Sequence, residues 1–115
     1  MIPKRLSRVG EAVRGEIGGM LLRDLKDPRI GFVTITDVVM SPDLRHAKVY
    51  FSRLGTDAER EESLQGLTAA AGWIRRELGQ RLDLKFAPEI RFYHDESLDA
   101  GVRIDRLLKE IKRPE

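Results

Sequence analysis

The side chains with the best capacity for covalent chemistry lie in one short run, His94-Asp95-Glu96-Ser97. These are residue types of acid–base and nucleophilic catalysis. Four adjacent residues cannot easily converge on one reacting atom, because neighbours along a strand point to opposite faces. We interpret the run as a strand end followed by a polar turn, and keep a hydrolase built on His94, Asp95 and Ser97 as an alternative.

Other chemical motifs are scarce. The sequence has no cysteine and only two histidines, His46 and His94, neither of which belongs to a helical HxxxH pair. We therefore expect no disulfide, metal or cofactor. No phosphate-binding loop of the Walker or GxGxxG type occurs. A GxxG pattern of the kind KH domains use occurs at 15–18, but it lies inside a predicted helix and contains Glu16, so we interpret it as coincidence.

Basic side chains are the remaining candidates, and most of the 21 are arginines, whose planar guanidinium suits phosphate contacts. The first predicted helix begins with cations, which its dipole disfavours, so an anionic partner explains them better than local stability does. Each residue could also be an ordinary solvated charge. The candidate polyanion-binding residues, chosen by charge and placement, are Lys4, Arg5, Arg8, Arg45, Lys48, Arg75, Arg76, Arg81 and Lys85.

Hydrophobic periodicity indicates the elements that position these residues. Apolar residues at three- and four-residue spacing predict a helix from Leu6 that ends at Asp27-Pro28. Three glycines inside it, Gly15, Gly18 and Gly19, are interpreted as places where another element approaches closely. Residues 31–40 predict a strand that a turn at 41–44 joins to a second, antiparallel strand.

The second half of the sequence predicts a long helix, a strand and a last helix. Thr56 and Glu59 match a capping box. Gly72 interrupts the helical run after it, and the spacing leaves open whether the helix is straight or bent. Residues 89–94 predict the third strand, and Ser97 or Asp99 could cap the last helix. The apolar stripe of that last helix is Ile104, Leu107, Leu108 and Ile111.

The resulting order predicts an α+β fold of two layers, a three-stranded sheet with helices on one face. The length of 115 residues and the 41% of hydrophobic residues suit a single domain over 1–115, with its core at about 5–95 and its last helix at about 98–112. No apolar run is long enough to span a membrane, and no signal-peptide core follows the N-terminus, so we expect a cytoplasmic protein.

Several stretches in order resemble the ribosome-binding factor A family, and the resemblance covers about residues 4–108. The most telling stretches are residues 26–36, 38–52, 70–78, 84–92 and 95–104. The resemblance implies a KH-like fold of type II order, α-β-β-α-(kink)-α-β plus a C-terminal helix. In that fold an Ala-x-Gly kink, here Ala70-Ala71-Gly72, replaces the GxxG loop. The glycine-rich stretch from Gly15 to Gly19 departs from the family pattern.

The resemblance also implies a function. Family members are non-enzymatic assembly factors without cofactors, which bind the free 30S small ribosomal subunit through 16S rRNA. They assist its late maturation and 16S rRNA processing, and they are linked to cold adaptation. The candidate cations would then grip RNA phosphates. The alternative is a protein–protein interaction module without direct RNA contact, built on an apolar patch such as the stripe of the last helix. We expect a monomer.

Overall fold

The computed structural model describes residues 4–96. Its elements, in chain order, are α1 (Lys4–Arg23), β1 (Thr34–Met40), β2 (His46–Ser52), α2 (Asp57–Arg81) and β3 (Glu89–His94). This order confirms the α+β prediction. The expected last helix at about 98–112, with its apolar stripe, lies outside the described residues.

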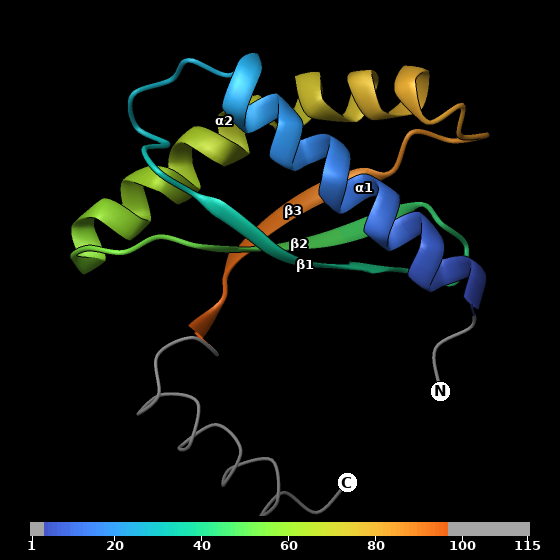
Figure 1. Cartoon of the computed structure of the whole chain (residues 1–115), viewed down its shortest axis with the longest axis horizontal. Helices are drawn as coiled ribbons and strands as arrows, with labels where there is room; N and C mark the ends of the chain where they lie inside the picture. Colours follow the sequence, from blue (N-terminus) through green and yellow to red (C-terminus); the bar gives the residue numbers. More distant parts are fainter. Residues whose placement is uncertain (1–3, 97–115) are drawn as a thin grey trace, which may run out of the picture.

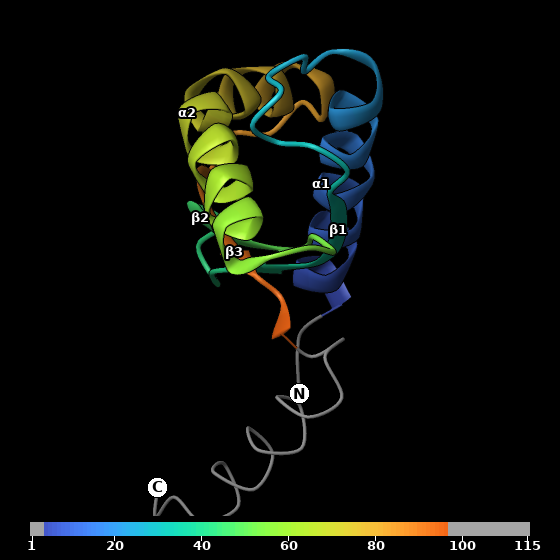
Figure 2. The same cartoon turned by 90° about the vertical axis from the view of Figure 1, so that its left-hand side faces the viewer.

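The three strands form one mixed sheet in the order β1-β2-β3. β1 and β2 pair antiparallel, as the short turn between them predicted, whereas β3 runs parallel to β2. Both helices cover the same face of this sheet, α1 over β1 and α2 over β3 (Figures 1 and 2). The two-layer architecture is therefore confirmed.

The core between the two layers is almost entirely aliphatic. β2 alternates, with Ala47, Val49 and Phe51 buried and His46 and Lys48 exposed on the other face. Burying each large apolar side chain contributes about 1.5–3 kcal/mol. The large apolar side chains with no exposed surface are Val13, Ile17, Met20, Val49, Phe51, Leu67, Ile74 and Leu78.

The predicted first helix extends beyond the end of α1, and the predicted first strand starts before the start of β1. α1 ends at Arg23 rather than continuing to Asp27, and the amides of Asp24 and Leu25 both bond the carbonyl oxygen of Met20 as the helix closes. β1 begins at Thr34 rather than at position 31. The reason is that Gly31 adopts a φ of 65°, a left-handed conformation that an extended strand cannot contain.

The interpretation of the α1 glycines was wrong for Gly15 and Gly18. A Cβ atom at either position would meet nothing within 4 Å, and one at Gly19 would meet only the side chain of Arg23 from the same helix. The close approach occurs instead at Gly10, where a Cβ atom would lie 2.9 Å from the carbonyl oxygen of Val38. Gly10 therefore lets α1 lie directly on β1.

α2 begins at the predicted capping box. The Thr56 hydroxyl accepts a bond from the Glu59 amide, and the Glu59 carboxylate accepts one from the Thr56 amide. The helix is continuous from Asp57 to Arg81, and its axis bends about midway (Figures 1 and 2). The kink that the resemblance implies is thus a bend within one helix. The GxxG pattern at 15–18 lies within α1 and forms no loop.

Candidate nucleic-acid interface

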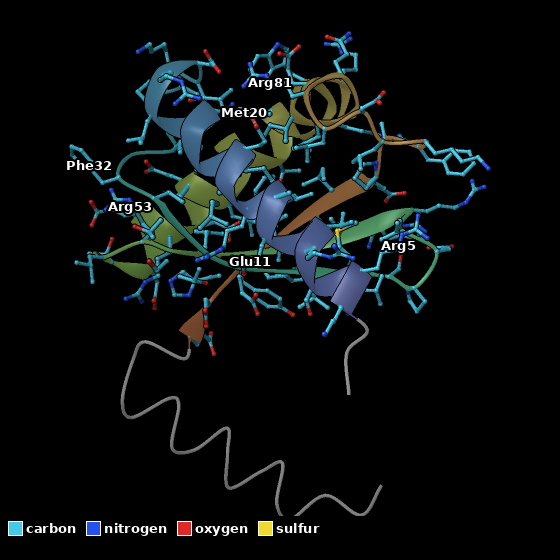
Figure 3. All side chains as sticks on the ribbon, turned by 45° about the vertical axis from the view of Figure 1, so that its right-hand side comes forward. Arg5, Glu11, Met20, Phe32, Arg53 and Arg81 are labelled. Carbon is cyan, nitrogen blue, oxygen red and sulfur yellow. The ribbon has the colours of Figure 1, made fainter. Side chains whose placement is uncertain are left out.

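Three segments far apart in sequence meet at one end of the molecule: the start of α1, the β1–β2 turn and the loop between α2 and β3 (Figure 1, right-hand side). They carry Arg5 and Arg8, which line one groove, and Arg45, Lys85 and Phe86, which lie against one another; we name these five residues the basic end. Figure 3 shows Arg5 projecting from the start of α1 at this end. The long helix α2 makes this possible because it returns the chain to the edge where β1 turns into β2.

A groove of about 290 Å³ separates the start of α1 from the chain that leaves α2. Arg5 and Arg8 stand on the α1 side, and Leu82 and Leu84 form part of the apolar opposite side. Both arginines are exposed. An apolar floor with cations at its rim suits a ligand that combines flat apolar parts with negative charge.

Arg45 and Lys85 lie around the ring of Phe86. The guanidinium carbon of Arg45 lies 4.0 Å from the ring centroid, and the Lys85 ammonium nitrogen lies 5.5 Å from it. Both distances fall in the range of a cation–π interaction. Phe86 as a whole residue remains 42% exposed even with Arg45 over its ring.

Hydrogen bonds fix the β1–β2 turn beneath Arg45. One carboxylate oxygen of Asp43 accepts bonds from the Ser41 hydroxyl at 2.6 Å and from the Arg45 amide at 3.0 Å. These bonds, the one from Ser41 above all, hold the pKa of the Asp43 carboxyl below its ordinary value. Arg45 is therefore presented by an ordered turn.

Further bonds fix the loop that carries Phe86. The Arg75 Nε donates to the carbonyl oxygen of Ala87 at 3.0 Å, and the Glu89 amide donates to the carbonyl oxygen of Arg45 at 2.8 Å. Pro88, between them, is buried. Arg75 thus holds the α2–β3 loop against α2.

The remaining candidate cations are spread over the surface. Lys4 is exposed at the start of α1, beside the basic end in sequence, and Arg76 is exposed on α2. Lys48 lies on the face of the sheet that the helices leave open. The structure therefore gathers Arg5, Arg8, Arg45 and Lys85 but places Lys48 on a different face.

Arg81 has a different environment, because three carboxylates surround it. Its guanidinium lies 2.9 Å from Glu77, 3.2 Å from Asp24 and 3.7 Å from Glu16. The hydrogen bond to Asp24, followed by the one to Glu77, raises the pKa of Arg81 above its ordinary value. We name these four residues the α1–α2 charge cluster, and Figure 3 shows Arg81 well away from Arg5. None of the other eight candidate cations has an ion-pair partner among residues 4–96.

The run that begins at His94 serves the fold. The His94 ring packs edge-on against Phe51 at 5.5 Å between centroids. The Thr36 hydroxyl donates to the Asp95 carboxylate at 2.6 Å, so Asp95 joins the end of β3 to β1. Ser97 lies outside the described residues. Within residues 4–96, no three potential ligands from His, Asp and Glu gather to hold a metal, and no helix is long and apolar enough to cross a membrane.

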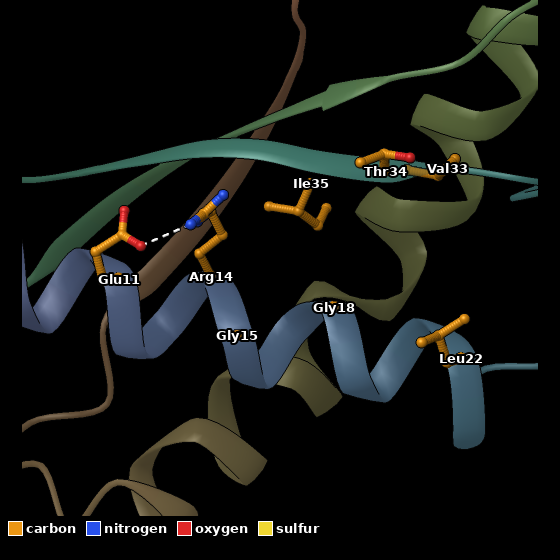
Figure 4. Close-up of a pocket in the computed structure, with 8 residues that line it drawn as sticks. All are labelled: Glu11, Arg14, Gly15, Gly18, Leu22, Val33, Thr34 and Ile35. Carbon is orange, nitrogen blue, oxygen red and sulfur yellow. Dashed lines mark hydrogen bonds and ion pairs between the residues drawn. The ribbon is translucent and has the colours of Figure 1, made fainter.

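A second hollow of about 370 Å³ lies between α1 and the edge strand β1 (Figure 4). Gly15 and Gly18 leave its α1 side open, and Ile35 lines its β1 side. Its two charged side chains, Glu11 and Arg14, pair with each other at 2.7 Å. This hollow therefore offers a polyanion no unpaired cation.

Sequence reasoning missed Phe86. It lies next to Lys85 in the sequence, which is a weak signal of an aromatic among cations. What gives Phe86 its place is Arg45, forty-one residues earlier, and only the pairing of β2 with β3 brings the two together.

The fold and this surface define a class: small KH-like α+β domains with a basic end suited to a polyanion. Two solved structures share the fold. The solution structure of a ribosome binding factor A from Thermotoga maritima has a TM-score of 0.67 at 37% identity and covers 87% of this chain and 96% of its own. A Thermus thermophilus ribosome binding factor A, a homology model fitted into a cryo-electron-microscopy map of a 30S complex, has a TM-score of 0.60. At 22% identity, over 82% of this chain and 94% of its own, it shows the fold alone.

The sequence comparisons give the family. The family model described as ribosome-binding factor A matches residues 5–108. A ribosome-binding factor A from Halothermothrix orenii is 48% identical over 112 residues, which cover 97% of this chain and 92% of the relative. The chain belongs to the ribosome-binding factor A family.

Proposed function

We propose that this protein binds the free 30S small ribosomal subunit through 16S rRNA and assists its late maturation, including 16S rRNA processing. The observation that carries the proposal is the basic end, where four cations from three segments stand without a carboxylate partner among the described residues. Family membership supports the choice of a ribosomal particle as the partner. The Thermus relative fitted into a 30S complex supports the choice of the small subunit.

The mechanism we propose is binding alone, without catalysis or cofactor, by a cytoplasmic monomer. Arginine and lysine contacts to phosphates supply affinity and release counterions, so binding weakens with salt. Folded RNA supplies selectivity through its shape rather than its base edges. A binder shifts RNA towards its mature fold only through unequal affinity for two RNA conformations. A role in cold adaptation would follow because misfolded RNA is more persistent at low temperature.

Co-sedimentation with free small subunits, large subunits and intact ribosomes across a salt series tests the proposal. We expect binding to small subunits only, with log affinity falling linearly against log salt concentration. The triple variant Arg5→Ala/Arg8→Ala/Arg45→Ala should make that slope shallower by about three, since each phosphate contact contributes about one. Absence of binding to any particle at low salt would overturn the proposal.

The matched control removes the same number of charges elsewhere. Arg14, Arg29 and Arg60 pair with Glu11, Asp27 and Asp57 at 2.7, 2.7 and 3.1 Å. Their triple alanine variant has the same net charge as the test variant. We expect it to keep the wild-type salt slope, which separates a local surface from a general charge effect.

A protein-interaction module without RNA contact is the second candidate. Three large apolar side chains are almost fully exposed: Phe32 at 94%, Leu54 at 88% and Leu22 at 82%. Figure 3 shows Phe32 at the end of the molecule opposite Arg5. Such a module would give small-subunit binding that hardly changes with salt and survives nuclease treatment of the subunit. The same sedimentation experiment therefore separates the two functions.

A further inference from the structure

We propose that the Arg45–Phe86 pair is a stacking site for one unpaired RNA base, next to phosphates held by Lys85 and by the arginines of the groove. The inference rests on the proposed function and deepens it, because it adds a contact to a base face to the contacts with phosphates. It assigns a binding role to Phe86, which charge alone does not mark.

The first reason to expect a stacking site is what surrounds the Phe86 ring. Exposing the ring of a phenylalanine to water is unfavourable in free energy unless another group covers the ring. Phe86 nevertheless stays 42% exposed, with Arg45 4.0 Å from its centroid. Aromatic rings and guanidinium planes are the two kinds of surface on which unpaired bases stack. Here the Phe86 ring and the Arg45 guanidinium lie next to each other.

The second reason is the backbone conformation next to Arg45 and Phe86. Among residues 4–96, only two residues other than glycine have positive φ: Leu44 at 61° and Asp83 at 49°. Leu44 directly precedes Arg45, and Asp83 lies in the loop that leads to Phe86. For a leucine this conformation is unfavourable, because its Cβ atom crowds the following carbonyl oxygen. Strained backbone of this kind persists at sites that must hold a side chain in a set position.

The third reason is the positive charge of Arg45 and Lys85 beside the ring. Neither Arg45 nor Lys85 has an ion-pair partner among the described residues. Their positive charge is therefore available to phosphates on either side of a stacked base. A base inside a duplex presents no free face, so this site selects unpaired nucleotides.

Stacking and phosphate contacts respond differently to salt, and this difference provides the test. A phosphate contact changes the slope of log affinity against log salt, whereas a stacked base changes affinity at every salt concentration alike. Phe86→Leu removes the ring and keeps an apolar side chain of similar size. Phe86→Tyr keeps the ring, and it is the matched control.

The experiment measures binding of wild type and both variants to free small subunits, to a twelve-nucleotide oligouridylate and to a twelve-base-pair RNA duplex. Thermal unfolding checks that each variant is folded. We expect Phe86→Leu to bind small subunits and the oligouridylate about tenfold more weakly with an unchanged salt slope. Phe86→Tyr should bind like wild type, and duplex binding should be equal for all three proteins.

Three other outcomes overturn the stacking site. Equal binding by wild type and Phe86→Leu removes the ring from the interface. A shallower slope for Phe86→Leu means that the ring only positions Arg45. A loss on small subunits without a loss on the oligouridylate indicates a protein contact. If the wild type binds no small subunit at all, the proposed function fails, which is a distinct result from failure of the stacking site.

Discussion

The basic end and the α1–α2 charge cluster use the same residue type for opposite purposes. In the charge cluster, Arg81 lies within 4 Å of three carboxylates, those of Glu16 on α1, Asp24 just after α1 and Glu77 on its own helix. In the basic end, Arg45 has an aromatic ring at 4.0 Å and no carboxylate partner among the described residues. Both were candidate RNA-binding residues on charge and placement alone.

The difference teaches that the partners of an arginine decide its role. Asp24 and Glu77 accept hydrogen bonds from one guanidinium nitrogen of Arg81, and with Glu16 nearby the local charge is negative rather than positive, which disfavours a phosphate. Arg81 therefore joins two helices of the same chain. Arg45 keeps its donors and its charge, so it can serve an outside partner.

The largest expected effect comes from Gly10, because α1 carries parts of both regions. Gly10→Ala places a methyl group 2.9 Å from a backbone oxygen of β1, which must move the helix away from the sheet. We expect a loss of about 1–3 kcal/mol in the free energy of unfolding. Small-subunit binding should weaken as well, because Arg5 and Arg8 move with the helix. Urea denaturation and co-sedimentation measure the two effects.

Gly15→Ala is the control for this prediction. A Cβ atom there meets nothing within 4 Å, so the substitution only improves helix propensity. It should raise the free energy of unfolding by about 1 kcal/mol and leave binding unchanged. Equal effects of the two substitutions would show that α1 does not rest on β1 at Gly10.

An intermediate effect is expected from Arg81→Met, which keeps the aliphatic stem of the side chain and removes its charge. Three carboxylates then face one another without a cation, so we expect a lower melting temperature and an unchanged salt slope of small-subunit binding. Arg60→Met is the control, since Asp57 is the one carboxylate that pairs with Arg60 among the described residues, and its other bond is to the carbonyl oxygen of Arg53. A shallower slope for Arg81→Met would mean that this arginine contacts RNA after all.

The smallest effect should come from the turn of the basic end at acid pH. The pKa of Asp43 lies below its ordinary value of 3.8, so its hydrogen bonds stabilise the folded protein above that pH. The stabilisation is lost as the pH falls through the lowered pKa. The wild type should therefore exceed Asp43→Asn in urea midpoint by a constant amount from pH 7 to about 4, and by less at lower pH. A difference that stays constant to pH 2.5 would contradict this assignment.

Much of the fold could be predicted because its signals are local. The capping box at Thr56 needs only four residues, and β3 has the predicted bounds because Pro88 precedes a short run of alternating apolar residues. In β2 the alternation of apolar and polar residues along the sequence matches the buried and exposed faces. Boundaries failed where backbone conformation decides them, as at Gly31, whose left-handed φ no residue pattern displays.

The candidate site could be predicted only in part, because it depends on what surrounds each charge. Charge and placement selected Arg45 and Arg81 equally, although only one of them keeps its charge free of carboxylates. One of the acids around Arg81, Glu77, lies four residues earlier on the same helix, but Glu16 on α1 and Asp24 just after α1 lie more than fifty residues away along the chain, where no local pattern reveals them. Phe86 was missed for the same reason.

The parallel pairing of β2 with β3 also has a consequence for the order of folding. β1 and β2 form a local hairpin, whereas β3 reaches β2 only after the whole of α2 has closed a long loop, so its pairing is entropically the more costly. Arg45 directly precedes β2 and Phe86 lies just before β3, so the two residues come together only when β3 pairs with β2. We therefore expect a chain still emerging from synthesis to lack the stacking site until its third strand has docked. Binding to RNA through this pair would then be reserved for molecules whose own folding is finished.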